Sequence, residues 1–476
     1  MMKSKLSPLK EVPVDIRAVH LDFKGMPPTF SRLLRLLDIF RAAGFNALLL
    51  EWEDAFPWTV EPAFRSPTAF TRQQVAEFHQ KARSLGFELI PLVQSIGHME
   101  TPLRSKKYAH LREVAENSDV LNVLAQGAGE LVREMMDEVL AATPDCRFFH
   151  LGGDEAITFG EHPDTRAFIQ AHGQAALYRH HIEPLCDHLL AHGVRPILWH
   201  DMMLTWSRAD LTALGAKADL CIWAYQRAAD IPWQFSMPAD VEGDLPLIFG
   251  GGQVVHGGTF KKFLASGMKL WGAGAYKLSE GRDNADLPVF SKRTLNALDW
   301  LACSRAFPLQ GLIATGWSRN CTDNVQYVPI DAALDTLMAC GCIWTTPGEA
   351  HCTREACLIR LEELGERRLY DEVADLMQRL TQRRVGGWSV VVRLRELLAL
   401  AENEPCRRVG GWADRHLAWL KDHCDKGEEL MAQALTVFAP LVEPIWVKHY
   451  FQERLGALRT EFADLQVRVE TRKKIE

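Results

Sequence analysis

The chain lacks the sequence features of membrane proteins and of disulfide-rich secreted proteins. No apolar stretch approaches the roughly 20 residues that a membrane-spanning helix needs, and residues 1–8 contain no apolar segment of a signal peptide. The 11 cysteines are odd in number and include no Cys-x-x-Cys pair. This usage favours free thiols in a reducing compartment over disulfides or a structural zinc site. We therefore expect a cytoplasmic protein with no membrane partner.

An excess of positive charge is missing as well. The 54 Lys and Arg residues are outnumbered by 61 Asp and Glu residues, so the net charge is -7. Such a chain has no electrostatic reason to bind nucleic acid. The length of 476 residues predicts one large domain with a smaller appendage. Its 14 tryptophans favour a carbohydrate site, because the faces of Trp rings stack on sugar rings.

A repeated helix-to-strand pattern predicts the fold. Gly44, Gly86, Gly193 and Gly267 each stand between a helical pattern and a strand-like run. Glycine commonly closes helices in the left-handed conformation, so the repetition indicates alternating β and α units around a parallel sheet. Eight candidate strands begin near Asp15, Phe45, Phe87, Phe148, Arg195, Leu220, Lys269 and Gly311. This number predicts a (β/α)8 TIM barrel over residues 12–345, with a doubly wound open sheet as the alternative.

The strand signals stop after the predicted barrel, and residues 346–476 predict an all-helical C-terminal domain rich in Leu, Glu and Arg. Near its end, apolar residues recur at alternating steps of three and four, as on one face of a helix. This stripe consists of Leu455, Leu458, Phe462, Leu465 and Val469. We expect it to pack against the barrel or against a second copy of the chain in a homodimer.

The most informative stretch is His150 to Glu155, with the sequence His-Leu-Gly-Gly-Asp-Glu, directly after an apolar run that predicts a buried strand. The two glycines allow a tight exit from the strand and a close approach of a ligand. The adjacent Asp154 and Glu155 point in different directions, so one can bind a ligand while the other transfers a proton. A lone Asp-Glu pair would indicate a solvated turn, but the six residues together favour catalysis.

Other predicted strands are followed by polar and aromatic residues too. The carboxyl ends of the strands carry the active site in TIM-barrel enzymes. The residues at the predicted ends are Asp22, Asp54, His98, Asp154, Glu155, Trp199, His200, Asp201, Trp223, Tyr225, Tyr276 and Trp317. Packing alone does not explain so many polar and aromatic groups at these positions, so we expect a ligand site there.

The His-x-Gly-Gly-Asp-Glu motif resembles the signature of glycoside hydrolase family 20, the β-N-acetylhexosaminidases. The segments HLDFKG (residues 20–25), PLVQSIGHME (91–100) and GAYK (274–277) are similar to the hexosaminidase D branch of that family. The resemblance extends in order over the whole predicted barrel. It implies hydrolysis of terminal β-linked GalNAc or GlcNAc from a carbohydrate or glycoconjugate with retention, in which the 2-acetamido oxygen of the substrate is the nucleophile.

The resemblance also implies the catalytic roles. Glu155 would be the general acid and then the general base, while Asp154 would orient the acetamido N–H and stabilise the oxazolinium charge. Tyr276 matches the tyrosine that donates a hydrogen bond to the acetamido oxygen. Trp199, Trp223 and Trp317 match the indoles that surround the sugar. For each Trp, a place in the core is the alternative.

Four further residues take supporting roles by the same resemblance. Arg17 matches an arginine that binds sugar hydroxyls, although Ala18 replaces the glycine that follows it in the family. Asp54 and His98 would form a hydrogen-bonded relay behind the general acid, with His150 in the same supporting layer. A buried histidine held by an aspartate for structural reasons alone is the alternative.

The chain departs from the family pattern at two positions. Secreted members have an Asp two residues after the tyrosine and a Glu two residues after the eighth-strand Trp, and this pair holds the sugar's 4- and 6-hydroxyls. Here these positions are Leu278 and Arg319. We expect the chemistry at C1 to be retained and recognition of the far edge of the sugar to differ.

Two other functions compete with this interpretation. A metal-dependent barrel hydrolase would gather ligands from His20, Asp22, His98, His150, His200 and Asp201. The first strand has no His-x-His pair, and such an enzyme would leave the Gly-Gly-Asp-Glu turn without a role. A non-catalytic sugar-binding barrel is the second alternative, which the intact acidic pair argues against. We expect neither a metal nor a cofactor.

Overall fold

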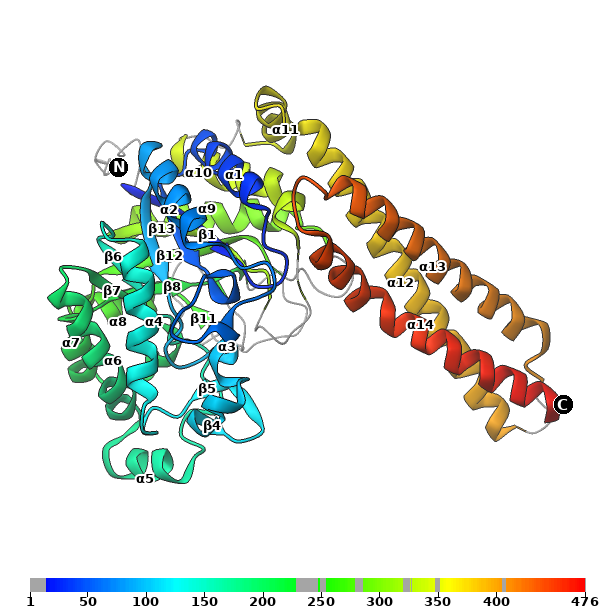
Figure 1. Ribbon diagram of the computed structural model, residues 1–476, viewed down its shortest axis with the longest axis horizontal. Helices are drawn as coiled ribbons and strands as arrows, with labels where there is room; N and C mark the ends of the chain where they lie inside the picture. Colours follow the sequence, from blue (N-terminus) through cyan, green and yellow to red (C-terminus); the bar gives the residue numbers. More distant parts are fainter. Residues whose placement is uncertain are drawn as a thin grey trace, which may run out of the picture.

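A computed structural model of the chain describes residues 14–227, 247–248, 254–278, 286–319, 326, 328–346, 352–404 and 408–475. Parallel strands close into a barrel in the order β1-β13-β12-β8-β7-β6-β3-β2 (Figure 1). The barrel strands are β1 (Ile16–Asp22), β2 (Ala47–Glu51), β3 (Glu88–Leu92), β6 (Phe148–His150), β7 (Arg195–Trp199), β8 (Asp219–Trp223), β12 (Leu270–Lys277) and β13 (Leu309–Gly316). All eight predicted strands are therefore present, and the closed ring excludes the open sheet.

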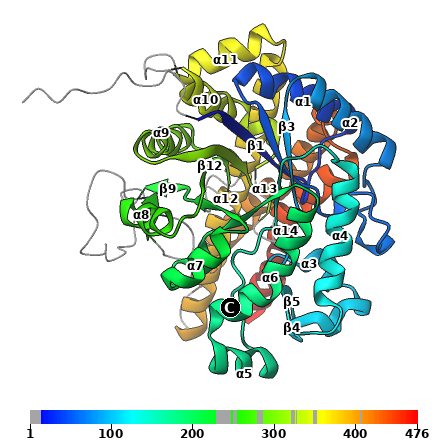
Figure 2. The ribbon, with the colours of Figure 1, turned by 90° about the vertical axis from the view of Figure 1, so that its left-hand side faces the viewer.

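Helices surround the strands on the outside of the barrel (Figure 2). They are α1 (Phe30–Ala43), α2 (Arg72–Ser84), α4 (Ala128–Ala142), α5 (Pro163–His172), α6 (Gln174–Ala191), α7 (Arg208–Gly215), α8 (Gly257–Ala265), α9 (Phe290–Ala306) and α10 (Leu334–Thr345). The short helices α3 (Glu100–Leu103), η1 (Glu53–Ala55) and η7 (Ile330–Ala333) lie in connections. Small strands outside the barrel are β4 (Arg112–Val114), β5 (Asn117–Leu121), β9 (Gln226–Arg227), β10 (Leu247–Ile248) and β11 (Val254–Val255).

The predicted glycine junctions are confirmed. Gly44 ends α1 with φ 101°, and its N–H donates to the carbonyl oxygens of Arg41 and Phe40. Gly86, Gly193 and Gly267 have φ values of 79°, 74° and 78°. This left-handed region is accessible to glycine at little cost. The junctions return the chain to the start of each strand, so the carboxyl ends of all the strands lie at one end of the barrel.

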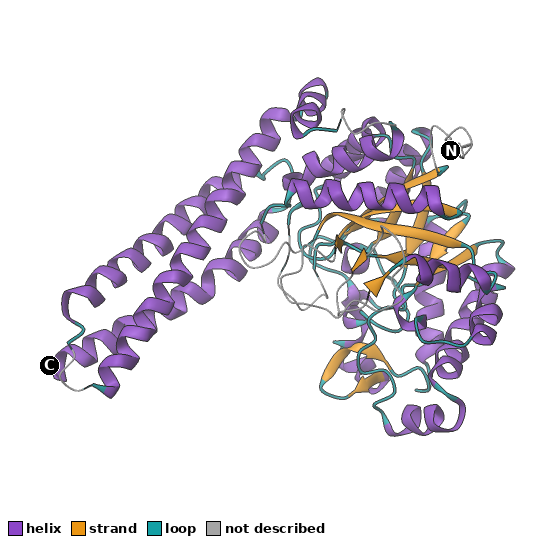
Figure 3. Cartoon of the chain, turned by 180° about the vertical axis from the view of Figure 1, so that it is seen from behind, coloured by secondary structure: helices purple, strands orange, loops and turns teal. Residues whose placement is uncertain are grey.

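The helical C-terminal region is confirmed as well, and it projects from one side of the barrel (Figures 1 and 3). It contains α11 (Arg354–Glu363), α12 (Arg367–Asn403), α13 (Gly410–Val437) and α14 (Pro444–Ile475). The last three pack together as a bundle, which we call the C-terminal bundle. The division into two domains at residue 345 stays a prediction. Among the described helices, none is both long and apolar enough to cross a membrane.

The apolar stripe of α14 packs inside this bundle. Leu458 and Leu465 are fully buried in a cluster with residues of α12 and α13. Two glycines allow α14 to pack closely against α12 and α13. A Cβ atom on Gly387 of α12 would lie 2.4 Å from Leu458, and one on Gly427 of α13 would lie 2.6 Å from Leu455. Since its own chain covers the stripe, the stripe gives no reason to expect a homodimer.

We predict that Leu458→Ala lowers the free energy of unfolding by about 2–5 kcal/mol, because it removes buried methyl groups and leaves a cavity. The change is measured by urea denaturation at several protein concentrations. Leu400→Ala, at a position of α12 that is 45% exposed, is the control and should cost little. A midpoint that rises with protein concentration would instead place the stripe between two chains.

Candidate active site

A strained turn after β6 carries the acidic pair. Gly152 and Gly153 have φ values of 60° and 81°, and Glu155 has φ 43°. A Cβ on Gly152 would lie 1.8 Å from Gln94 Oε1, and one on Gly153 would lie 2.3 Å from Tyr178 Oη. Both glycines are therefore needed for the backbone to fit between its neighbours. A non-glycine residue with positive φ is unusual, and such strain commonly occurs at functional sites.

The two carboxylates of the pair have different surroundings, as the sequence predicts. The Asp154 side chain is 6% exposed and the Glu155 side chain is 30% exposed. His98, which follows β3 and also has positive φ, places its Nε2 atom 3.5 Å from both Asp154 Oδ2 and Glu155 Oε2. Asp154 thus lies at the base of the site and Glu155 at its opening.

Electrostatics keep His98 charged. Burial alone would lower the pKa of His98, but the charge of Asp154 and hydrogen bonds to Asp154 and Glu155 raise this pKa well above its ordinary value. The protonated imidazole therefore pairs mainly with Asp154 and also lies within reach of Glu155.

Asp201, which follows β7, is a site residue to which the sequence gave a role only as a ligand in the alternative metal-dependent hydrolase. Its Oδ2 atom accepts a hydrogen bond from the Glu155 backbone N–H at 2.9 Å, and its Oδ1 atom accepts one from Trp223 Nε1 at 3.1 Å. Burial and the charge of Asp154 raise the pKa of Asp201 to about 7. Its position at a strand end, among the polar residues noted there, was the signal that could have identified it.

The predicted tryptophans gather at the carboxyl ends of the strands. The rings of Trp317 and Trp199 are 6.0 Å apart, and Trp317 also contacts His20 at 4.7 Å. Trp223 stacks on Tyr225 with a centroid separation of 5.1 Å, and Tyr225 lies 6.4 Å from Trp317. Trp199 is fully buried between His150 and Trp317, so it takes the place in the core that was its alternative. The rings of Trp223, Tyr225 and Trp317 form an aromatic wall close to the acidic pair.

Tyr225 is therefore a residue of the site that the sequence placed at a strand end without a role. Its ring is 8% exposed. Burial raises the pKa of its phenol well above the ordinary range, and the charge of Asp154 adds to this effect. The phenol is consequently a hydrogen-bond donor at every physiological pH.

The structure does not bring Tyr276 to this site. A Cβ on Gly316 of β13 would lie 2.3 Å from Tyr276 Oη, so the phenol covers the outer face of Gly316. Successive side chains of a strand point to opposite faces, and Trp317, which follows Gly316, lies in the aromatic wall. Tyr276 is fully buried, and its carbonyl accepts a hydrogen bond from Thr336 of α10 at 2.8 Å. Its prediction as an acetamido-binding residue does not fit this placement.

Arg17 does not lie at the sugar-binding site that the family resemblance implies. It lies at the start of β1, at the opposite end of the barrel from the site. Its Nε atom donates to the carbonyl of Gly44 at 3.1 Å and its Nη1 atom to that of Val14 at 3.0 Å. Arg17 therefore closes the amino-terminal end of the barrel and is too remote to bind a sugar at the acidic pair.

The predicted relay between Asp54 and His98 is wrong as well. Asp54 lies in η1 beyond the end of β2, where its Oδ2 atom faces Arg104 Nη2 at 3.8 Å. His150 does lie directly beneath the site: its ring is 4.2 Å from that of Trp199, and its Nδ1 atom accepts from Gly152 N at 2.9 Å. Burial lowers the pKa of His150 to about 3, so the ring is neutral.

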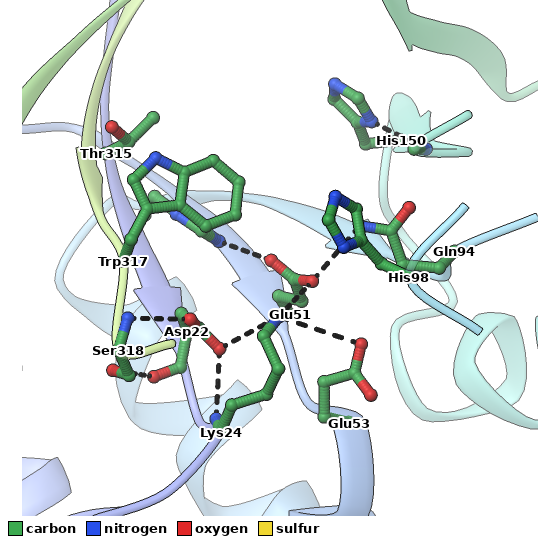
Figure 4. A network of polar contacts seen from close by, with 12 residues as sticks. Asp22, Lys24, Glu51, Glu53, Gln94, His98, His150, Thr315, Trp317 and Ser318 are labelled. Atoms are coloured by element: carbon green, nitrogen blue, oxygen red, sulfur yellow. Dashed lines mark hydrogen bonds and ion pairs between the residues drawn. The ribbon is translucent and has the colours of Figure 1, made fainter. Parts of the chain in front are cut away.

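A buried charged network lies at the carboxyl ends of β1 and β2, next to Trp317 (Figure 4). Lys24 Nζ donates to Glu51 Oε1 at 2.6 Å and lies 3.2 Å from Asp22 Oδ1. His20 Nε2 lies 2.9 Å from Glu51 Oε2. Burial opposes ionisation of Glu51, but Lys24 and His20 lower its pKa well below the ordinary value. Glu53 differs, because burial raises its pKa to about 8.

The same network bears on the metal-hydrolase alternative. Nε2 of His20 already contacts Glu51, and Nδ1 of His150 accepts a backbone hydrogen bond. Within the part of the chain that the structure describes, no group of three or more His, Cys, Asp and Glu residues is arranged to hold a metal ion.

Comparison with known proteins adds independent information. Residues 17–232 match the family described as glycosyl hydrolase family 20, catalytic domain. The chain is 32% identical to hexosaminidase D of Bos taurus over 313 residues, which covers 64% of this chain and 84% of that protein. It is 32% identical to hexosaminidase D of Homo sapiens over 337 residues, 69% of this chain and 65% of that protein. A Flavobacterium johnsoniae chitobiase structure aligns with 97% of this chain and 75% of its own, with a TM-score of 0.55 at 16% identity, a likeness of fold.

We predict that Asp154→Asn lowers the pKa of His98, because burial then outweighs the remaining attraction. Histidine NMR titration between about pH 5 and 9 measures the change. In the wild type, the raised pKa stabilises the fold below the unfolded-state pKa of about 6.5, and this stabilisation is lost as pH rises through the folded-state pKa. The Asp154→Asn variant should lose this dependence of folding stability on pH.

Asp164→Asn, which removes the carboxylate beside His162 near the surface, is the control. An unchanged His98 titration in Asp154→Asn would refute the ion pair between His98 and Asp154.

Proposed function

Because the chain belongs to glycosyl hydrolase family 20, we propose that it releases terminal β-linked GalNAc or GlcNAc with retention, using the 2-acetamido group of the substrate as nucleophile. It is a glycoside hydrolase, and its family supports β-N-acetylhexosaminidase activity. One observation carries the proposed mechanism: Asp154 and Glu155 lie on one strained turn, one buried and the other at the opening, beside an aromatic wall.

The proposed orientation of the sugar follows from the aromatic wall and the acidic pair. The indoles of Trp223 and Trp317 offer flat apolar faces to the pyranose and to the N-acetyl methyl group, while the buried Trp199 packs against Trp317. Asp154 accepts the hydrogen bond of the acetamido N–H. The phenol of Tyr225, and not that of Tyr276, donates to the acetamido oxygen. C1 then lies next to Glu155, and the leaving group points outward, as an exo-acting enzyme requires.

The proposed reaction has two steps. In the first, the acetamido oxygen attacks C1, the glycosidic bond breaks, and Glu155 transfers its proton to the leaving oxygen. The resulting oxazolinium ion carries a positive charge next to the Asp154 carboxylate, which stabilises it. In the second step, Glu155 removes a proton from water as this water attacks C1 from the side that the leaving group occupied, and the bond between C1 and the acetamido oxygen breaks to return the 2-acetamido group. Two inversions at C1 give overall retention.

The positions of the charged groups support this division of roles. His98 is protonated near neutral pH, so its charge pairs with the Asp154 carboxylate that faces the developing cation. The backbone N–H of Glu155 donates to Asp201, which fixes the turn that carries the general acid. Preorganised charges of this kind need no rearrangement during the reaction.

We predict that Glu155→Gln lowers kcat/KM by about 10²–10⁴-fold on alkyl N-acetyl-β-hexosaminides, because their leaving oxygen needs a proton. Dinitrophenyl glycosides, whose leaving group departs as a stable anion, should lose much less. Steady-state kinetics on both substrates with purified enzyme provide the measurement, and Glu161→Gln in the connection before α5 is the control. Equal losses on both substrates would show that Glu155 is not the acid.

A pair of tyrosine variants tests substrate assistance. Tyr225→Phe should weaken inhibition by a thiazoline mimic of the cyclised intermediate at least about tenfold, because one hydrogen bond to a charged ligand is lost. Tyr276→Phe should leave the inhibition constant within about twofold, since its phenol faces away from the site. The reverse result would restore Tyr276 to the role that the sequence predicts. Failure of the thiazoline to inhibit the wild type would remove substrate assistance altogether.

A further inference from the structure

One carboxylate of the C-terminal bundle holds the segment that follows β13. Arg319 lies just after the aromatic wall residue Trp317 and is 8% exposed. Its Nη2 atom donates to Glu453 Oε1 of α14 at 3.1 Å. The other oxygen of Glu453 accepts from the backbone N–H of Gln326 at 3.1 Å. Glu453 therefore fixes two points of this segment at once, although it lies more than a hundred residues further along the chain.

The contact of Glu453 with Arg319 is one of several polar contacts that join the C-terminal bundle to the site end of the barrel. Asp286, between β12 and α9, is fully buried and accepts hydrogen bonds from Tyr450 Oη at 2.6 Å and Thr381 Oγ1 at 2.8 Å. It also forms an ion pair with Arg454. Trp446 Nε1 donates to Thr68 Oγ1, between β2 and α2, at 2.6 Å. Helices α12 and α14 thus attach to connections that follow β2, β12 and β13, all at the end that carries the site.

The strand order indicates which edge of the sugar faces Arg319. In the closed ring, β13, β1 and β2 lie opposite β6, β7 and β8. Asp154 and Tyr225 follow β6 and β8, so the C1–C2 edge of the pyranose faces that side. The C4–C5 edge then faces the side of β13 and β1. A Cβ on Gly25, directly after Lys24, would lie 3.0 Å from Arg319 Nε, which places the guanidinium beside the charged network.

We infer that the C-terminal bundle is part of the sugar-recognition apparatus: Glu453 is a positioning residue that holds Arg319 toward the C4 edge of the bound sugar. GalNAc and GlcNAc differ only in the configuration of the C4 hydroxyl. The Glu453–Arg319 pair therefore sets the preference between these two sugars, whereas Asp154 and Glu155 act on groups that both share. This inference rests on the proposed function and deepens it.

The test is the ratio of kcat/KM for p-nitrophenyl β-GalNAc and p-nitrophenyl β-GlcNAc in the full-length chain. We expect Glu453→Gln to change this ratio at least about fivefold, and Arg319→Met to change it in the same direction. Arg319→Lys, which keeps the charge but not the planar fork, should give an intermediate ratio. Glu453→Gln should have no further effect on the ratio in the Arg319→Met background.

A matched substitution on the same helix is the control. Glu461 of α14 pairs with Arg395 of α12 within the C-terminal bundle. Glu461→Gln therefore removes the same charge from α14 and breaks an Arg–Glu pair, but one that does not contact the barrel. It should leave the ratio of the two substrates unchanged, and thermal unfolding of every variant identifies losses of stability.

Three outcomes would overturn the inference. Equal losses on both substrates in Glu453→Gln and both Arg319 variants, with an unchanged ratio, would mean that the junction is only structural. A ratio shift by Glu453→Gln that persists in the Arg319→Met background would mean that Glu453 does not act through Arg319. A similar ratio shift in Glu461→Gln would attribute the effect to the bundle's charge. Failure of the wild type to hydrolyse either glycoside would be a different result, because it would contradict the proposed function itself.

Discussion

The contact of one histidine with two adjacent carboxylates is the interaction on which the candidate site depends. Asp154 and Glu155 are neighbours in sequence, and His98 reaches both from the next strand of the barrel. Both His98 and Glu155 have positive φ, a conformation that costs on the order of 1–3 kcal/mol per residue and persists only where surrounding contacts impose it. Here the tight fit of Gly152 against Gln94 and the hydrogen bond from Glu155 to Asp201 supply those contacts.

The closed barrel places this turn next to aromatic rings and close to a buried charged network. The strands β6, β7 and β8 bring together the acidic pair and the stacked rings of Trp223 and Tyr225. On the other side, β1 and β2 end in the buried network of Lys24 and Glu51. The network is almost fully buried and its charges are paired with one another, so it supports the ends of β1 and β2 and the neighbouring Trp317.

The C-terminal bundle extends this organisation beyond the barrel. Its apolar stripe packs against α12 and α13 of the same chain. Where α14 meets the barrel, Tyr450, Glu453 and Arg454 form polar contacts with residues of the barrel connections. Buried charges at a junction are costly unless they are paired, and removing one partner is strongly destabilising. The bundle is therefore joined to the site end of the barrel by contacts that fix one orientation.

The sequence by itself determined the eight strands, the glycine junctions and the acidic turn, because these depend on local periodicity and on the conformational freedom of glycine. It also identified the tryptophans that gather at the strand ends. Only the tertiary structure decided which tyrosine joins them. The pairing register of β12 with β13 shifts between Ala275 and Lys277, next to Tyr276, and no local pattern reveals which face this side chain takes. Likewise, the contact of Glu453 with Arg319 joins residues far apart in the chain, and such pairs arise from packing rather than from sequence spacing.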